Sequence, residues 1–312
     1  MDGGGDASNA DASDSAADAG DSVIGGPIPA PKPVGCVTDV SPGSHHFTCD
    51  GLDYDVSVPD ACVSRSCGLI IDVHGGTMSG PMEDKNTNLA ALGKRHGYVV
   101  ITPTAFAGLW NYSTDDPKVL AFLQATRDAF HVNPRRIHMT GLSQGGYMSW
   151  RFLCQHTELF GSVAPAAAAG AAAISIEVGC TFTGQDVPKG ELDILYMHGK
   201  DDALVNFQNA LTLRDALIAY YRMGAGKAVA GDTTYTRTRY STASGRVFEF
   251  IEHHYSTDSN FLGVAIKGHC FPGSHDQTIT LPNQLMAFGC KPPNSFTWGE
   301  EVIRFFMTHP KP

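Results

Sequence analysis

The sequence predicts an α/β protein in which helices cover both faces of one mostly parallel sheet. Three observations predict this class. Short apolar runs rich in β-branched residues are typical of strands buried on both faces. Stretches with helical spacing alternate with these runs. A chain of 312 residues that is 42% hydrophobic can also bury one large core. We therefore expect one large domain.

The first 33 residues differ from the rest, because they are rich in Asp, Ala, Gly, Ser and Pro. Such a composition buries too little apolar surface to offset the entropy lost on ordering. We expect residues 1–33 to be a disordered tether and residues 34–312 to be a single domain. No apolar signal-peptide core follows Met1, so a signal peptide is either absent or already removed.

Strands and helices then alternate along the chain. Apolar runs predict strands at 68–76, 98–104, 136–141 and 193–199. Amphipathic stretches predict helices at 115–130, from about Gln144 onward, at 206–223 and at 295–310. In such a sheet, ligands gather beyond the carboxyl ends of the strands.

Charge and hydropathy exclude some classes of protein. The net charge is -10, but six aspartates and no Lys or Arg lie within residues 1–31, which leaves -4 for the remainder. This balance gives no reason to expect nucleic-acid binding. No stretch of 18 apolar residues occurs, so we expect no transmembrane segment.

The eight cysteines suggest disulfides. An even number of cysteines in a tethered chain indicates an oxidising compartment. A tether of this composition is common in secreted or lipid-anchored bacterial proteins, so we expect a bacterial protein that is secreted or tethered at the cell surface. Pairing of sequence neighbours is the simplest arrangement; buried thiols, Cys154 above all, are the alternative. No CxxC or HExxH spacing occurs, so we expect neither a metal nor another cofactor. The expected pairs are Cys36 with Cys49, Cys62 with Cys67, Cys154 with Cys180, and Cys270 with Cys290.

The stretch GLSQG, residues 141–145, has the pattern of a nucleophile elbow. Ser143 follows a predicted strand, precedes a predicted helix, and has glycines two positions before and after it. Glycines permit a sharp turn and a close approach of helix to strand, and a helix amino terminus favours developing negative charge. A tight turn without catalysis is the alternative. We predict that Ser143 is a nucleophile.

A serine hydroxyl needs a base, and the base needs an acid partner. In proteins with this elbow the chain order is Ser, then Asp or Glu, then His. His269 is the predicted base, because it lies in a glycine-containing loop before the last helix; His275 is the alternative. Asp202 is the predicted acid, because it lies in the turn after a strand; Asp201 is the alternative, and helix capping could also explain this pair.

The tetrahedral intermediate of acyl transfer carries an oxyanion that needs two hydrogen-bond donors. One should be the amide of Gln144, which follows the nucleophile. The other should come from the loop after the 68–76 strand, where we predict Gly76, with Thr77 as the alternative. His74 in the same loop is interpreted as a bracing residue. A flexible turn is the other explanation for these glycines.

Several segments together carry a family resemblance. In chain order they are DVHGGTMSG, the region from LWNYSTDD to LFGSVAP, HGKDDALV and GHCFPG. From about Gly68 to Gly273 the chain resembles the secreted poly(3-hydroxybutyrate) depolymerase and feruloyl esterase group of α/β-hydrolases. The resemblance implies the α/β-hydrolase fold, with Ser143 as nucleophile, Asp202 as acid and His269 as base.

The chain also departs from that group. The group often has Thr and Trp in the two positions after the catalytic histidine, where this chain has Cys270 and Phe271. Phe271 could supply an aromatic wall for substrate, with Trp110 opposite; buried packing is the alternative for Trp110. The cysteine suggests that a disulfide to Cys290 braces the histidine loop.

These features predict a secreted serine carboxylic-ester hydrolase that forms an acyl-enzyme. The resemblance implies an ester substrate that is polymeric, either a polyester or a polysaccharide ester; we expect the protein to be a monomer. Two other functions remain open: a serine peptidase of the prolyl oligopeptidase type, and an inactive hydrolase fold that binds a polysaccharide.

Overall fold

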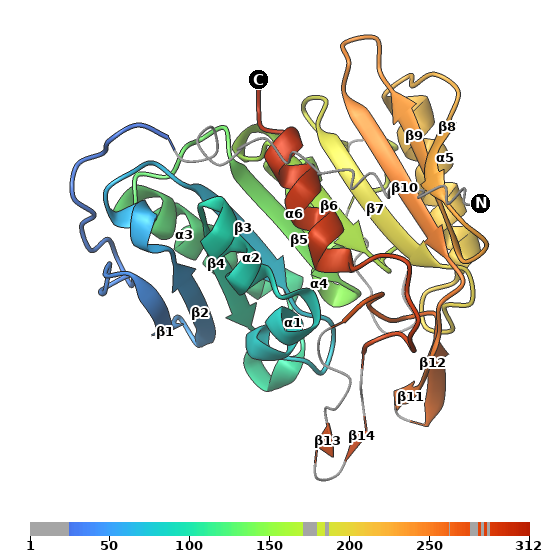
Figure 1. Cartoon of the computed structure of the whole chain (residues 1–312), viewed down its shortest axis with the longest axis horizontal. Helices are drawn as coiled ribbons and strands as arrows, with labels where there is room; N and C mark the ends of the chain where they lie inside the picture. Colours follow the sequence, from blue (N-terminus) through green and yellow to red (C-terminus); the bar gives the residue numbers. More distant parts are fainter. Residues whose placement is uncertain are drawn as a thin grey trace, which may run out of the picture.

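A ten-stranded sheet runs through the protein, with parallel strands in its middle and antiparallel strands at both edges (Figure 1). The computed structural model describes residues 25–170, 180–184, 187–261, 263–274, 280–281, 284–285 and 288–312. The strand order is β1-β2-β4-β3-β5-β6-β7-β10-β9-β8. The parallel strands are β4 (Tyr98–Thr104), β3 (Gly68–Val73), β5 (Ile137–Leu142), β6 (Ser162–Ala166), β7 (Asp193–Gly199) and β10 (Val247–His253).

Antiparallel strands complete both edges of the sheet. They are β1 (Gly43–Cys49) and β2 (Leu52–Val58) on the side of β4, and β9 (Tyr235–Ser241) and β8 (Lys227–Gly231) on the side of β10. Two small hairpins lie outside the sheet. They pair β11 (Thr257–Phe261) with β12 (Val264–Lys267), and β13 (Thr280–Leu281) with β14 (Gln284–Leu285).

Helices cover both faces of the sheet, as Figure 1 shows. One face carries α1 (Gly80–Thr87), α2 (Leu89–His96) and α6 (Trp298–Thr308). The other carries α3 (Tyr112–Ala129), α4 (Gln144–Gln155) and α5 (Phe207–Tyr220). Short 3-10 turns are η1 (Asp60–Val63), η2 (Phe106–Gly108) and η3 (Thr157–Leu159). Each face therefore buries its own apolar core against the sheet.

The expected fold class is confirmed, and the four expected strands are present as β3, β4, β5 and β7. All residues of β3, β5 and β7 are buried, which explains their continuous apolar runs. The sequence did not predict β6, because Pro165 argues against a strand in the middle of a sheet. It did not predict β8 either, because every residue of that strand is exposed.

The ordered domain begins before the boundary expected at residue 33. The amides of Gly25, Ile28 and Lys32 donate hydrogen bonds to backbone carbonyls of the domain at 2.7, 3.2 and 3.1 Å. Residues 25–33 therefore lie along the domain and are not part of a tether. Composition could not show this, because the contacts use the backbone and require no apolar side chain. Residues 1–24 of the expected tether lie outside the described residues.

Four disulfides join sequence neighbours among the cysteines, which is the arrangement expected from the sequence. They are Cys36–Cys49, Cys62–Cys67, Cys154–Cys180 and Cys270–Cys290, and no cysteine is left unpaired. The last of these ties the loop after β12 to the segment that leads into α6. Their sequence separations range from 5 to 26 residues.

Two carboxyl groups are buried between β3 and α1. Asp72 on β3 accepts a hydrogen bond from Thr87 Oγ1 at 2.6 Å, and Glu83 on α1 is fully buried. Burial raises the pKa of Asp72 to about 7, even though the Thr87 hydroxyl opposes this shift. Burial, together with the nearby Asp72 carboxyl, raises the pKa of Glu83 well above its usual range. The fold therefore favours the neutral form of both acids.

The disulfides should stabilise the protein by an amount that grows slowly, as the logarithm, with the length of the loop each one closes. Replacing Cys270 and Cys290 by Ala releases a loop of 20 residues, and replacing Cys62 and Cys67 releases one of 5. The entropy regained by the unfolded chain should lower the free energy of unfolding by about 3 kcal/mol in the first variant and about 2 kcal/mol in the second. Urea unfolding of both variants measures this order. A larger loss from the shorter loop would contradict it.

The buried Asp72 should make stability depend on pH. In the unfolded chain its pKa returns to 3.8, so the folded protein retains a proton that the unfolded chain releases between about pH 4 and pH 7. Its stabilising contribution is complete below pH 4 and is lost as the pH rises through 7. Between pH 5 and pH 8, the free energy of unfolding should fall by about 2 kcal/mol more in the wild type than in Asp72→Asn.

Urea titrations at both pH values measure this difference. Asp60→Asn is the control, because Asp60 is exposed and should leave the wild-type pH profile unchanged. Parallel pH profiles for Asp72→Asn and the wild type would contradict the prediction.

Candidate active site

Ser143 occupies a strained turn between β5 and α4. Its backbone has φ 53° and ψ -117°, a conformation that non-glycine residues rarely adopt. The turn is held on both sides: the Ser143 amide donates to the carbonyl of Ala166 at 3.0 Å, and the Ser143 carbonyl accepts from the amide of Tyr147 at 2.9 Å. The side chain of Ser143 is partly exposed. In a nucleophile elbow this exposure allows a substrate to reach the hydroxyl.

The flanking glycines are required because α4 begins against the backbone of β3. A Cβ atom on Gly145 would lie 1.8 Å from the carbonyl oxygen of Val73, and one on Gly141 would lie 2.4 Å from the same oxygen. Both distances are too short for any side chain. The pattern around Ser143 thus reflects a close contact between helix and strand, in addition to the sharp turn.

Asp202 and His269 form a buried carboxylate–imidazole pair. Asp202 follows β7, His269 follows β12, and Nδ1 of the imidazole donates to Oδ2 of the carboxylate at 2.7 Å. The other carboxylate oxygen accepts hydrogen bonds from the amides of Leu204 and Val205, at 2.9 and 2.8 Å. One side chain therefore both holds the imidazole and closes the turn after β7.

Electrostatics favour the ionised form of Asp202. Burial alone would raise its pKa, but the charge and hydrogen bond of His269 oppose this effect, with help from His198 and the Val205 amide. The net result is that the pKa of Asp202 is below its usual value. A carboxylate in this state can stabilise an imidazolium ion next to it.

The backbone of each loop keeps this pair together. The backbone of Asp202 pairs with that of Lys267 in an isolated antiparallel β-bridge, and the Gly268 amide donates to the carbonyl of Asp201 at 3.2 Å. The side chain of Asp201, the alternative acid, is exposed and is not the one that contacts His269. His275, the alternative base, lies outside the described residues.

The structure brings two of the three predicted catalytic side chains into contact. Within the described part of the chain, no hydrogen bond joins the hydroxyl of Ser143 to Nε2 of His269. Ser143 follows β5, and His269 contacts Asp202, which follows β7. Both residues therefore lie at the edge of the sheet where the parallel strands end. Hydrogen bonds at catalytic sites without substrate are often long, so the lack of this bond does not exclude that Ser143 acts together with the Asp202–His269 pair.

Two backbone amides are available as oxyanion donors. Among the described residues, the amides of Gly76 and Gln144 donate no hydrogen bond, and Gln144 is the first residue of α4. The amide of Thr77, the alternative donor, is occupied, because it donates to the carbonyl of Gly108 at 2.7 Å. A Cβ atom on Gly76 would lie 3.3 Å from Oε1 of Gln144, so the two amides belong to adjacent segments.

His74 and Trp110 brace the loop that carries Gly76. His74 is fully buried; its Nδ1 contacts the Gly75 carbonyl at 2.6 Å, and its Nε2 accepts from the amide of Ala105 at 3.0 Å. Burial lowers the pKa of His74 to about 4, so the imidazole is neutral. The Trp110 indole donates to the His74 carbonyl at 2.9 Å. Trp110 is only 6% exposed, so packing describes it better than an open substrate wall.

The expected aromatic wall at Phe271 is wrong for this structure. Phe271 has no exposed surface and belongs to the apolar core on the α6 side. Its amide donates to the Phe288 carbonyl at 2.7 Å, and its carbonyl accepts from the Cys290 amide at 2.9 Å. These bonds lie beside the Cys270–Cys290 disulfide, which braces the loop of His269 as expected. They turn the ring inward.

Sequence reasoning missed two buried groups next to the site. The carboxyl group of Glu83 lies near the backbone of Gly75 and Leu142, which flank the nucleophile, and has no hydrogen-bond partner within the described residues. His198 on β7 lies between the Tyr196 hydroxyl and the Val205 carbonyl, at 2.8 and 2.9 Å. Glu83 left no signal, because an acid in a helix usually faces solvent.

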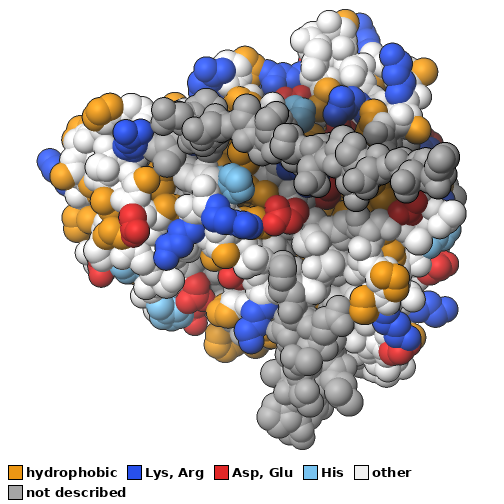
Figure 2. All heavy atoms as spheres, in the orientation of Figure 1, with side chains coloured by type: hydrophobic (Ala, Val, Ile, Leu, Met, Phe, Trp, Pro, Cys, Tyr) orange, Lys and Arg blue, Asp and Glu red, His pale blue; other side chains and the backbone are white. Residues whose placement is uncertain are grey.

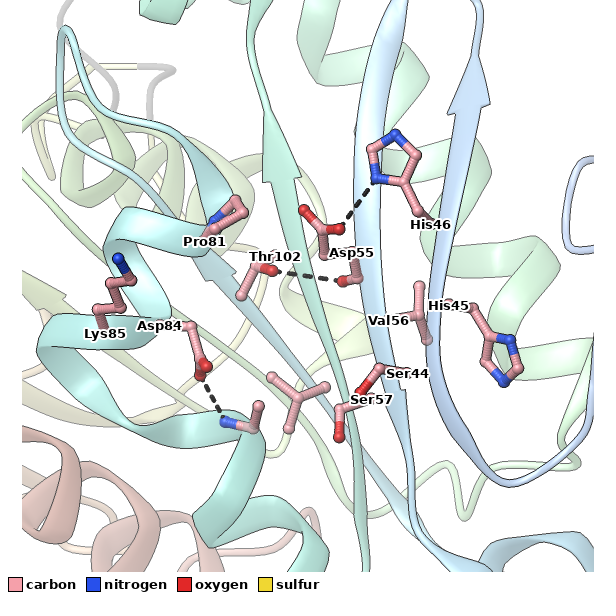
Figure 3. A pocket seen from close by; sticks show the side chains of 12 residues that line it. Ser44, His45, His46, Asp55, Val56, Ser57, Pro81, Asp84, Lys85 and Thr102 are labelled. Atoms are coloured by element: carbon pink, nitrogen blue, oxygen red, sulfur yellow. Dashed lines mark hydrogen bonds and ion pairs between the residues drawn. The ribbon is translucent and has the colours of Figure 1, made fainter.

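A hollow of about 450 Å³ lies away from this site, between α1 and strands β1, β2 and β4 (Figure 3). Its polar groups are engaged locally. His46 contacts Asp55 at 2.9 Å, Asp84 accepts from the Ala90 amide at 2.6 Å, and Thr102 donates to the Asp55 carbonyl at 3.3 Å. The hollow includes neither the nucleophile nor the acid–base pair.

The described ranges hold neither a cluster of metal-ligating side chains nor a membrane-spanning helix. No group of three or more His, Cys, Asp or Glu side chains is placed there to hold a metal ion. The helices within those ranges are also too short or too polar to cross a membrane.

No family model matches the chain, but individual proteins do. It is 22% identical over 162 residues to the bifunctional acetylxylan esterase/xylanase XynS20E of Neocallimastix patriciarum, which covers 51% of this chain and 22% of that protein. It is 23% identical over 145 residues to acetylxylan esterase A of Aspergillus ficuum, which covers 43% of this chain and 45% of that protein. The chain thus spans less than half the length of these curated relatives.

Among solved structures, the chain is similar to the acetyl xylan esterase from Aspergillus awamori. The TM-score is 0.53 and the identity 14%, and the match covers 67% of this chain and 92% of that one. At this identity the likeness concerns the fold alone, here a mostly parallel sheet with helices on both faces. The chain therefore has the α/β-hydrolase fold, and it resembles esterases that have this fold.

Proposed function

We propose that this protein is a serine carboxylic-ester hydrolase that removes acyl groups from polysaccharides. The observation that carries the proposal is the buried Asp202–His269 pair on the loops that follow β7 and β12, in a fold that holds Ser143 in a strained elbow. The names of the curated relatives, both acetylxylan esterases, support acetylated xylan as the substrate class. Aromatic acyl groups such as ferulate and aliphatic polyesters are the substrates against which this class must be tested.

The first half of the reaction acylates Ser143. Nε2 of His269 takes the proton of the hydroxyl as Oγ attacks the ester carbonyl carbon, and the carbonyl oxygen becomes an oxyanion. The amides of Gly76 and Gln144 donate hydrogen bonds to that oxyanion. When the intermediate collapses, the bond to the sugar oxygen breaks, and His269 returns its proton to this leaving alcohol.

The second half releases the acid. Water gives a proton to His269 as its oxygen attacks the acyl carbon, and a second oxyanion forms at the same two amides. Collapse then breaks the bond to Oγ of Ser143, which recovers its proton from His269. The acid leaves, and the protein is unchanged.

Asp202 acts through the imidazole. Because its Oδ2 accepts from Nδ1 of His269, the neutral ring carries its proton on Nδ1 and presents an unprotonated Nε2 to the hydroxyl. The same carboxylate stabilises the imidazolium that forms during each step. The low pKa of Asp202 supports this role, since the acid keeps its negative charge.

Four disulfides support a location outside the cytoplasm, because reducing conditions inside cells keep thiols unpaired. Xylan is itself an extracellular polymer. The location and the substrate class therefore agree with each other.

The proposal is tested by acyl release from a small panel. The wild type should release acetate from acetylated xylan and hydrolyse p-nitrophenyl acetate, and Ser143→Ala should lose at least about 10⁴-fold in kcat on both, because the nucleophile is absent. Ser113→Ala, a change of an exposed serine on α3, is the control and should retain turnover. Methyl ferulate and a poly(3-hydroxybutyrate) film complete the panel. Cleavage of the film but not of acetylated xylan would replace the substrate class, and full activity of Ser143→Ala would end the proposal.

The two neighbouring aspartates offer a test of the acid. In Asp202→Asn the amide oxygen can still accept from Leu204 and Val205, but the amide nitrogen faces Nδ1 and favours the wrong imidazole tautomer. We expect kcat on p-nitrophenyl acetate to fall roughly 10³- to 10⁴-fold, with little loss of stability. Asp201→Asn is the matched control and should stay close to the wild type. Equal effects of both changes would argue against the assigned acid.

A further inference from the structure

A groove lies at the same sheet edge as the candidate active site, between the loops that follow β3 and β4. Its volume is about 420 Å³. Asp53 at the start of β2 and Thr104 at the end of β4 are paired in register across one wall. The two loops contribute Thr77, Met78 and Phe106 to the lining of the groove.

The groove adjoins the nucleophile through the oxyanion loop. A Cβ atom on Gly75 would lie 3.4 Å from the Cβ atom of Ser143, and Thr77, two residues further on, already lines the groove. The loop after β4 is fixed to the same place, because the Gly108 carbonyl accepts from the Thr77 amide at 2.7 Å. One short loop, from Gly75 to Thr77, therefore connects the surroundings of Ser143 with the lining of the groove.

Phe106 is held at the rim of the groove with its ring in solvent. It is 83% exposed, the highest value among the exposed large hydrophobic residues of the described chain, and Leu109 nearby is 49% exposed. Its backbone is fixed on both sides: the Ala105 amide donates to His74 at 3.0 Å, and the Gly108 amide donates to the Ala105 carbonyl at 3.0 Å. Figure 2 shows hydrophobic side chains in small groups across this face of the molecule, one of them low in the view. A single exposed aromatic ring is common on protein surfaces, but this ring lies at the rim of a groove and on a turn whose backbone is fixed.

We propose that the groove is a sugar-binding subsite, in which Phe106 contacts the C–H face of a pyranose unit in the polysaccharide that carries the ester. This inference rests on the proposed function. A pyranose ring has an apolar face and a rim of hydroxyl groups, so it needs a flat apolar contact with polar partners around it. An aliphatic polyester has no hydroxyl groups along its chain and would leave those polar partners unused.

The polar partners are Asp53 and Thr104. Asp53 Oδ1 accepts from the Thr48 hydroxyl at 2.7 Å, and half of the Asp53 side chain is exposed, so its other oxygen can accept from a sugar hydroxyl. The Thr104 hydroxyl oxygen accepts from the Gly80 amide at 2.8 Å and still has its own proton to donate. The groove thus supplies an acceptor, a donor and an aromatic face.

The test separates sugar binding from catalysis. Binding of xylohexaose, an oligosaccharide without esters, is measured by titration calorimetry to the Ser143→Ala protein. Adding Phe106→Ala should weaken this binding roughly tenfold, and adding Phe106→Trp should preserve it, because an aromatic face is retained. Val229→Ala is the control, since Val229 is an exposed apolar residue on β8, far along the sheet, and should leave binding unchanged.

Kinetics provide the second measurement. With Ser143 intact, Phe106→Ala should lower kcat/KM for acetylated xylohexaose about tenfold more than for p-nitrophenyl acetate, mainly through KM. An equal loss on both substrates would mean that Phe106 acts through the Thr77 loop, and would overturn the subsite. Unchanged xylohexaose binding in Phe106→Ala would also overturn it.

The two proposals can fail separately. If xylohexaose binding depends on Phe106 but the wild type releases no acetate, the subsite stands and the esterase proposal fails. If the wild type deacetylates xylan with no dependence on Phe106, the esterase proposal stands and the subsite fails.

Discussion

The hydrogen bond between Asp202 and His269 is the interaction on which the proposed chemistry depends. It joins the loop after β7 to the loop after β12, two segments 67 residues apart in the chain. The carboxylate is buried, so the bond forms where water does not weaken it. The same carboxylate also accepts two backbone amides. These two amides fix the carboxylate of Asp202 in the turn after β7. The imidazole of His269 is therefore aligned against a carboxylate that cannot easily move.

The strained backbone of Ser143 is maintained by its surroundings. A residue in this conformation persists only where neighbouring structure determines it. Here the determinants are the hydrogen bonds of Ser143 to Ala166 and Tyr147, and the contact between α4 and β3 that excludes a side chain at Gly145. The buried carboxyl groups of Asp72 and Glu83 belong to the same packed region between β3 and α1. Rigidity at the nucleophile is thus a property of the sheet centre and does not arise from the turn alone.

The sequence predicted those features that arise from neighbouring residues in the chain, and it missed those that depend on contacts between separate segments. The strands β3, β5 and β7 are buried throughout and read as apolar runs, and the elbow is a local pattern of glycines around Ser143. The turn after β7 favoured Asp202 over its neighbour Asp201, and Asp202 is the one whose carboxylate contacts His269. The ring of Phe271 turns inward through contacts with Phe288 and Cys290, which are distant in the chain and invisible in a local pattern.

The loop after β3 links the chemistry to the groove. The Gly76 amide makes no hydrogen bond within the described residues, and the amide of the next residue, Thr77, donates to the Gly108 carbonyl in the turn that carries Phe106. Under the proposed function, the Gly76 amide would serve the reacting ester, while the neighbouring Thr77 amide holds the turn that carries Phe106. Because His74 fixes this loop to Ala105 as well, the two loops form one unit. In this arrangement a sugar bound at the groove rests on the same backbone that positions the oxyanion donor, so binding energy gained there helps to orient the ester at Ser143.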